Sequence, residues 1–187
     1  MEKIQLLDST GAEVIRGATV MEQMSAHGRF EFVCYDKDGN IKWTDVSDNI
    51  VTNQGKNNML DTYLGLAPLP PAWYMSLITA GTAISTSTYA SPTVTEITSG
   101  IITSNTRVTM GWSAASAGAK AATTTSFTVT GTATVTGNMV VTGSTGASTV
   151  ANTGASGGVL FSSSAFSGGS KNISNGDTLN VTYSISV

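Results

Sequence analysis

Apolar and polar residues alternate along much of the second half of this chain, and this alternation restricts the fold more than any other feature. In the closing stretch DTLNVTYSISV the apolar positions are Leu179, Val181, Tyr183, Ile185 and Val187, and Asn, Thr or Ser lies between them. A period of two places the apolar side chains on one face of a β-strand. Because a chain end frays unless something holds it, we expect another strand to pair with this last one.

Three earlier Thr/Val-rich segments show the same alternation, namely RVTMGWSA (107–114), SFTVTGTATVTGNMVVTG (126–143) and GGVLFSSSAF (157–166). Turn residues separate these segments at intervals of about 8–12 residues, a spacing typical of all-β sandwiches. The sequence therefore predicts a mainly β protein built on an antiparallel β-sandwich. Jelly-roll and immunoglobulin-like strand orders are both compatible with the pattern.

A β-hairpin and a short helix are expected before these segments. In RFEFVCYDKDGNIKWTDV, residues 29–46, apolar and polar residues alternate on both sides of Asp38-Gly39, a dipeptide that favours tight turns. The period then changes, since Met59, Leu60, Tyr63 and Leu64 recur at helical spacing. This predicts a helix over about 54–64, with Thr52 or Asn53 as its N-cap and Gly65 as its stop. A proline-rich loop and a buried strand, WYMSLI (73–78), follow.

Charged residues are distributed unevenly along the chain. Sixteen of its charged residues fall within residues 1–61, and only Glu96, Arg107, Lys120, Lys171 and Asp177 follow. The two parts are therefore expected to meet different surroundings. We expect residues 1–27, which include two apolar runs around the turn signal DSTG, to form an N-terminal arm or hairpin. Residues 28–187 are expected to form one β-sandwich domain.

Composition excludes several classes of protein. The net charge is −3, whereas a nucleic-acid-binding protein needs a basic face to neutralise phosphates. No stretch approaches the roughly 18 apolar residues of a membrane span, and no signal peptide is evident. The one cysteine, Cys34, allows neither an intrachain disulfide nor a cysteine-based zinc site. We expect a soluble protein of a reducing cytoplasm that binds neither nucleic acid nor membrane.

Motifs that carry chemistry are missing from the sequence. Neither the G-x-S-x-G nucleophile elbow nor a phosphate-binding P-loop occurs, and His27 is the single histidine. Asp36, Asp38 and Asn40 begin like an EF-hand loop, but the required Gly and Glu are missing at positions six and twelve, so we interpret them as a hairpin tip. We therefore expect no catalytic, cofactor-binding or metal-binding residues, and no enzyme activity.

Glycan chemistry is the alternative from another class. It would use Trp73 or Trp112 as a platform and Glu96 or Asp177 as acids. Aromatic residues are dispersed along the sequence, which is typical of a sandwich core rather than of a glycan-binding face. Carboxylates are explained more simply by surface solubility and helix capping; those considered are Asp45, Asp48, Asp61, Glu96 and Asp177.

Three segments together resemble a family of small virion structural proteins of tailed bacteriophages. They are an N-x-V-T-x-x-G-x-x-x-(L/M)-L helix, then W-Y-x-x-L, then a closing F-S-G-G-x-K hairpin with G-D-x-L-x-V. In this chain the matching residues are Asn49, Val51, Thr52, Gly55, Met59, Leu60, Trp73, Tyr74, Leu77, Phe166, Ser167, Gly168, Gly169, Lys171, Gly176, Asp177, Leu179 and Val181. The resemblance spans about residues 28–187, and the closing hairpin is its most specific part.

The resemblance implies a virion protein that is assembled in the host cytoplasm. The first expectation is a decoration (cement) protein, bound outside the head shell to the major capsid protein and to neighbouring copies of itself as a trimer or dimer. The alternative is a tail or fibre component that contacts the host through the polar loop 143–158. A glycan-binding or glycan-degrading protein is a third, weaker expectation.

Overall fold

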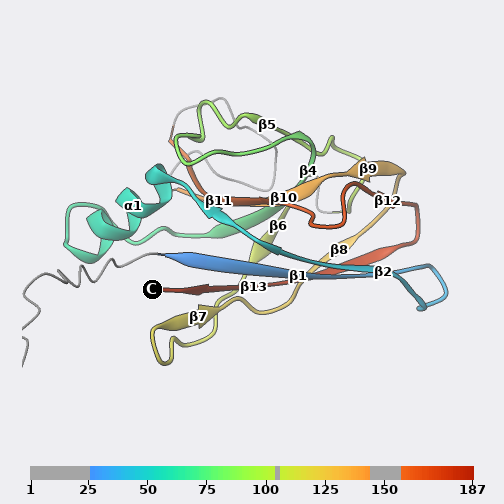
Figure 1. The fold of residues 1–187 in the computed structure, drawn as a ribbon, viewed down its shortest axis with the longest axis horizontal. Helices are drawn as coiled ribbons and strands as arrows, with labels where there is room; N and C mark the ends of the chain where they lie inside the picture. The colour runs from blue at the N-terminus through green and yellow to red at the C-terminus, as the bar shows by residue number, and fades with distance from the viewer. Residues whose placement is uncertain (1–25, 104–105, 144–156) are drawn as a thin grey trace, which may run out of the picture.

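Two antiparallel β-sheets pack face to face in a computed structural model of the chain (Figure 1). The structure describes residues 26–103, 106–143 and 157–187, so nearly all of the expected arm and most of the polar loop 143–158 lie outside the described residues. The first sheet has the order β2-β1-β13-β7, and β8 also pairs with β13. Its strands are β1 (His27–Tyr35), β2 (Ile41–Asp48), β7 (Ala119–Ala121), β8 (Thr125–Thr128) and β13 (Thr178–Ser186).

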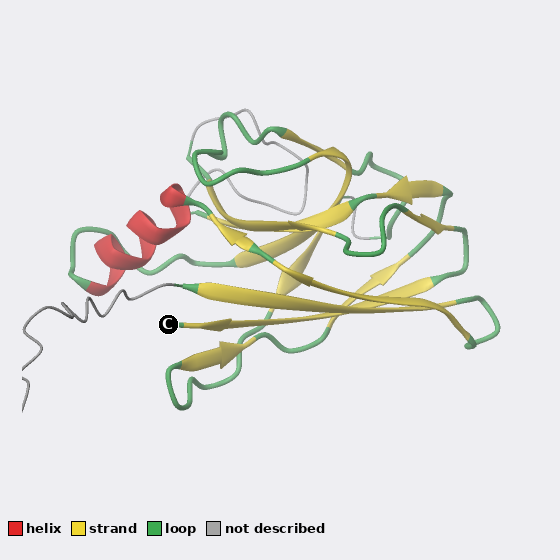
Figure 2. Ribbon diagram, viewed as in Figure 1, coloured by secondary structure: helices red, strands yellow, loops and turns green. Residues whose placement is uncertain are grey.

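The second sheet has the order β3-β11-β10-β4-β5, and β6 also pairs with β4. Its strands are β3 (Ile50–Val51), β4 (Trp73–Gly81), β5 (Val94–Glu96), β6 (Arg107–Met110), β10 (Gly137–Thr142) and β11 (Val159–Ala165). A small two-stranded sheet of β9 (Ala133–Val135) and β12 (Lys171–Ile173) completes the described strands. Figure 2 shows that the described part of the chain is strand and loop with one helix, so the predicted mainly β sandwich is confirmed.

The last strand lies in the interior of the first sheet. β13 pairs with β1 over its whole length, from Tyr35↔Thr178 to His27↔Ser186, and its other edge pairs with β8 and β7. The expected pairing of the chain end is thereby confirmed.

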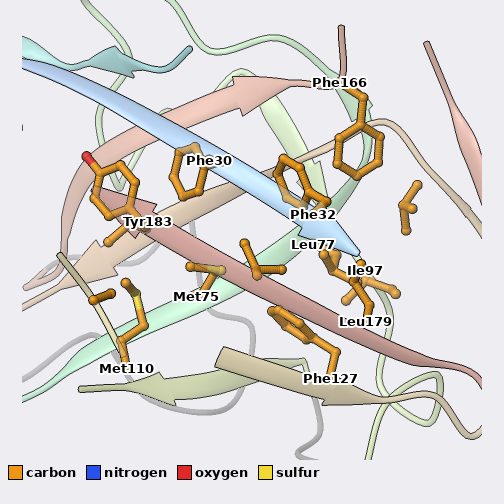
Figure 3. Packing of buried hydrophobic residues seen from close by; sticks show 14 of the residues in the cluster. Phe30, Phe32, Met75, Leu77, Ile97, Met110, Phe127, Phe166, Leu179 and Tyr183 are labelled. Carbon is orange, nitrogen blue, oxygen red and sulfur yellow. The ribbon is translucent and has the colours of Figure 1, made fainter. Parts of the chain in front are cut away.

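The main core fills the space between the sheets, as Figure 3 shows. The first sheet contributes aromatic residues, and the rings of Phe30 and Tyr183 stack with their centroids 4.2 Å apart. The second sheet and its loops contribute Met75, Leu77 and Met110. Because these side chains alternate with exposed ones along β1 and β13, the two-residue period seen in the sequence corresponds to this core.

The second sheet is buried on both faces. Its outer face packs Ile78, Met139, Val141 and Leu160 against the loop residues Ala83 and Tyr89. All six residues of β10 are therefore buried, polar ones included. A sheet covered on both sides does not need polar residues at every second position.

The helix α1 (Asn53–Tyr63) begins and ends one residue earlier than expected. Thr52 is its N-cap, since its side chain accepts a hydrogen bond from the backbone N–H of Gly55. Gly65 follows the helix with a φ of +86°, a conformation that glycine adopts without strain. α1 lies at one end of the sandwich, beside the point where β1 begins and β13 ends (Figure 1).

Candidate interaction surface

The N-x-V-T-x-x-G segment docks α1 onto the second sheet. Thr52 is fully buried and its hydroxyl donates to the carbonyl of Leu160. Gly55 lies against Phe161 so closely that a Cβ there would clash with the Phe161 backbone. Asn49 donates from Nδ2 to the hydroxyl of Tyr183 at 2.7 Å, which connects the segment to the first sheet. These motif residues therefore build the fold.

Gln54 has a structural role that the sequence analysis missed. Its Oε1 accepts hydrogen bonds from the backbone N–H groups of Tyr89, at 2.8 Å, and of Leu160, at 2.9 Å. Its Nε2 donates to the carbonyl of Gly158 at 3.3 Å. One side chain thus ties the first turn of α1 to two loops. An isolated glutamine in a polar stretch carries no pattern that would reveal this role.

The F-S-G-G-x-K segment is organised by Asp45, which is 6% exposed. Its carboxylate accepts hydrogen bonds from the N–H and hydroxyl of Ser167 and from the N–H of Gly168, and it forms a 3.2 Å ion pair with Lys171. Burial alone would raise the pKa of Asp45, but the hydrogen bonds from Ser167 and Gly168 outweigh it and the pKa is lowered. The expected surface role of Asp45 is therefore wrong.

Glu96 and Asp177 are also buried, contrary to the expectation of surface solubility. Asp177 forms a 2.7 Å ion pair with Lys42 and accepts a hydrogen bond from the N–H of Ser174, which holds the turn before β13. Glu96 accepts two hydrogen bonds from the guanidinium of Arg107, at 2.6 and 2.8 Å. The two carboxylates belong to different parts of the sandwich and each has a basic partner. The expectation is correct for Asp48 and Asp61, which are exposed.

The buried pair of Arg107 and Glu96 includes Tyr89, whose hydroxyl accepts a 2.8 Å hydrogen bond from Arg107. Burial would lower the pKa of Arg107, but the hydrogen bonds to Glu96 and Tyr89 outweigh it and raise the pKa. Arg107 therefore stays charged inside the protein. The cluster joins β5 and β6 to the loop that covers the outer face of the second sheet.

Trp73 and Trp112 pack with the core as part of an aromatic cluster. Their rings meet edge to face with centroids 5.4 Å apart, and they also contact Phe161 and Tyr183. The glycan-platform alternative would need rings that stand free on one strand face. The arrangement instead matches the core role expected from their dispersed positions.

The segment 36–40 is the turn of the hairpin between β1 and β2. Asp36 accepts hydrogen bonds from the backbone N–H groups of Asn40 and Asp38, which lower its pKa, and Gly39 has a φ of +84°. His27 is exposed at the start of β1. Within residues 26–103, 106–143 and 157–187, no group of three or more His, Cys, Asp and Glu side chains is placed to hold a metal ion.

An exposed apolar surface lies at the α1 end of the sandwich. It comprises Leu60, Tyr63, Leu64, Leu66 and Leu69, which are 52–89% exposed, and we call it the α1 surface. Five large apolar side chains within ten residues are unusual on a monomer, whose exposed apolar residues are normally scattered. Helical spacing assigned Leu60, Tyr63 and Leu64 to a helix face, and Leu66 and Leu69 fell in the expected loop, so the sequence did not identify this surface.

A hollow of about 270 Å³ adjoins the α1 surface. Ala26, Lys56, Met59, Leu60 and Val187 line it, so it lies between the start of β1, one face of α1 and the end of β13. Apart from Lys56, the described residues of its wall are apolar. Among the described residues, no helix combines the length and the apolar character that crossing a membrane requires.

Compared with protein-family models, with curated proteins and with solved structures, the chain matches none of them.

Proposed function

We propose that this chain is a structural protein of a tailed-bacteriophage virion, and that it decorates the outside of the head shell by bridging capsid subunits. The α1 surface is the observation that carries the proposal, since it offers five exposed apolar side chains to a partner at one end of the sandwich. The resemblance of three segments to small virion proteins supports the same function.

Several of the residues that carry the resemblance are buried and hold the fold together, which supports the proposal. Thr52, Gly55 and Asp177 hold the helix, the sheets and the last turn together. We therefore expect a protein that shares these residues to pack its helix and last turn in the same way. Partner binding then depends on the exposed residues that the sandwich presents.

The proposed mechanism is passive. Each Å² of apolar surface removed from water contributes roughly 25 cal/mol before association costs are subtracted. A single α1 surface gives a modest contact, but many copies on one shell reinforce each other through avidity. The arm expected at residues 1–27 would add a strand or segment to a neighbouring subunit.

Copy number in purified virions tests the location. On a stained gel a head decoration protein is present in hundreds of copies, whereas a tail or fibre component is present in few, about three to twelve, because tail symmetry limits it. Low copy number would replace the decoration role with the tail alternative. Complete absence from particles would overturn the virion role itself.

The α1 surface is tested by the double variant Leu66→Lys, Leu69→Lys. Both side chains are more than 80% exposed, so the fold should be retained while occupancy on decorated heads falls at least about tenfold. Ile41→Lys is the matched control, because Ile41 is 63% exposed and begins β2 beside the β1–β2 turn, which Figure 1 shows at the other end of the sandwich from α1. Equal occupancy of all three proteins would show that the α1 surface does not bind the shell.

A further inference from the structure

The hollow beside α1 has the size and composition of a binding site for a few side chains. Its volume of about 270 Å³ falls below the roughly 300–1,000 Å³ of small-molecule pockets. Met59, Leu60, Val187 and Ala26 give it an apolar wall, and none of the described residues that line it carries a catalytic group. Such a wall suits the apolar side chains of a peptide segment.

We propose that residues 20–25 of the same chain, VMEQMS, occupy this hollow and seat Met21 or Met24 against Met59 and Leu60. The described chain begins at Ala26, which is itself part of the wall. A residue spans at most about 3.6 Å along the chain, so the Cα of Met24 lies within roughly 7 Å of the Cα of Ala26. Methionine is flexible and fills irregular apolar gaps well.

Charge supports this occupant. Among the described residues, Lys56 is the one charged residue in the wall, and it forms no ion pair with any of them. Glu22 lies between the two methionines, and residues 1–25 hold four acidic and two basic residues, namely Glu2, Asp8, Glu13 and Glu22 against Lys3 and Arg16. A segment with acidic and apolar residues therefore complements the hollow.

A second folded copy is a poorer occupant. A stable protein–protein interface uses about 20–30 residues on each side, whereas five residues of the described part of the chain line the hollow. A tethered segment also binds at high effective concentration, so a small contact suffices. Docking of residues 20–25 would fix the base of the arm beside the α1 surface, because Leu60 belongs to both. This inference does not depend on the virion role.

Disulfide trapping in the full chain tests the proposal. In Met24→Cys, Met59→Cys protein under mild oxidation, we expect an intrachain disulfide, seen as a faster monomer band without reductant and as a linked peptide by mass spectrometry. Leu60→Cys is the second acceptor, because Leu60 is exposed and its replacement leaves the core intact. The native Cys34 is fully buried and burial raises its pKa to about 11, so it should not compete.

The matched control is Met24→Cys, Asp48→Cys. Asp48 is exposed at the end of β2 and pairs with Arg29, three residues from Ala26, so the tether also lets Met24 reach it, but Asp48 does not line the hollow. Both hollow pairs should form the intrachain disulfide at least about tenfold faster than this control. Equal rates would overturn the proposal. Covalent dimers without intrachain product would also overturn it and would assign the hollow to a neighbouring copy's segment.

Discussion

Asp45 illustrates how single carboxylates hold this sparsely charged protein together. It receives hydrogen bonds from Ser167 and Gly168 and pairs with Lys171, so one side chain fixes the loop between β11 and β12 onto β2. Its pKa is lowered. A group with a lowered folded-state pKa stabilises the protein above its unfolded-state pKa, and this stabilisation is lost as the pH falls through the folded-state pKa.

Asp45→Asn should therefore lower the free energy of unfolding by about 2 kcal/mol at pH 7. The difference from the native protein should shrink as the pH falls below the ordinary aspartate value of 3.8. Urea unfolding followed between pH 7 and pH 3 measures both effects. Asp48→Asn is the control, since the Asp48 side chain is 85% exposed with one 3.9 Å ion pair, and it should cost under about 0.5 kcal/mol. A pH-independent difference would contradict the assignment.

The effect of a substitution at Gly55 on stability distinguishes helix propensity from packing. In a free helix Gly→Ala stabilises by about 1 kcal/mol, but a Cβ at Gly55 would fall on the carbonyl oxygen of Phe161 and within 2.9 Å of its Cα. We expect Gly55→Ala to destabilise the protein by about 2 kcal/mol, as measured by thermal unfolding. Asn57→Ala, at an exposed position of the same helix, should be neutral or stabilising. Stabilisation by Gly55→Ala would show that α1 does not pack closely on β11.

At the scale of the element, β13 organises the first sheet. It is paired on both edges, and its apolar face supplies Leu179, Val181 and Tyr183 to the core. Burial raises the pKa of Tyr183 to about 12, so its hydroxyl stays protonated beside Asn49. The last three residues of β13, Ser184 to Ser186, pair with all three residues of β7.

Removing residues 184–187 should lower the free energy of unfolding by about 3 kcal/mol or more. The truncation deletes the buried Ile185 and the ladder to β7, and each lost contribution amounts to about 1–3 kcal/mol. Hydrogen exchange should show lost protection of the amides in Ala119–Ala121. Removing Val187 alone should cost less than about 1 kcal/mol, because its side chain is 56% exposed. Equal effects of the two truncations would contradict this role of β13.

The alternating pattern predicts faces of strands but not the sheet to which a strand belongs. In the alternating segment 126–143, the apolar residues Phe127, Val129 and Val135 lie an even number of positions apart and are buried, as the alternation predicts. The chain nevertheless leaves β8 in the first sheet, pairs β9 with β12, and enters β10 in the second sheet. Alternation is a local property, whereas the choice of partner depends on residues far along the chain.

For the whole molecule, the sequence indicates the sandwich, the helix and the paired last strand, because hydrophobic period and turn residues act locally. The sequence does not indicate the ion pairs. Arg107 and Glu96 are eleven residues apart, and Lys42 and Asp177 are 135 apart. The α1 surface was missed for another reason, since its leucines continue an apolar pattern that usually marks a core and only the fold leaves them uncovered.

The arm expected at residues 1–27 yields the last prediction, made with two truncations because β1 begins at His27. A chain that lacks residues 1–19 keeps VMEQMS and should unfold at the native temperature. A chain that lacks residues 1–25 uncovers the hollow and should lose about 1–2 kcal/mol of stability while still folding, because the described core begins at Phe30. Calorimetry of the two truncated chains measures their unfolding temperatures and stabilities. If the arm binds the shell, both truncations should also lose occupancy on heads. Equal stability of the two truncations would contradict docking of residues 20–25, and full occupancy of both on heads would contradict the arm's role in binding.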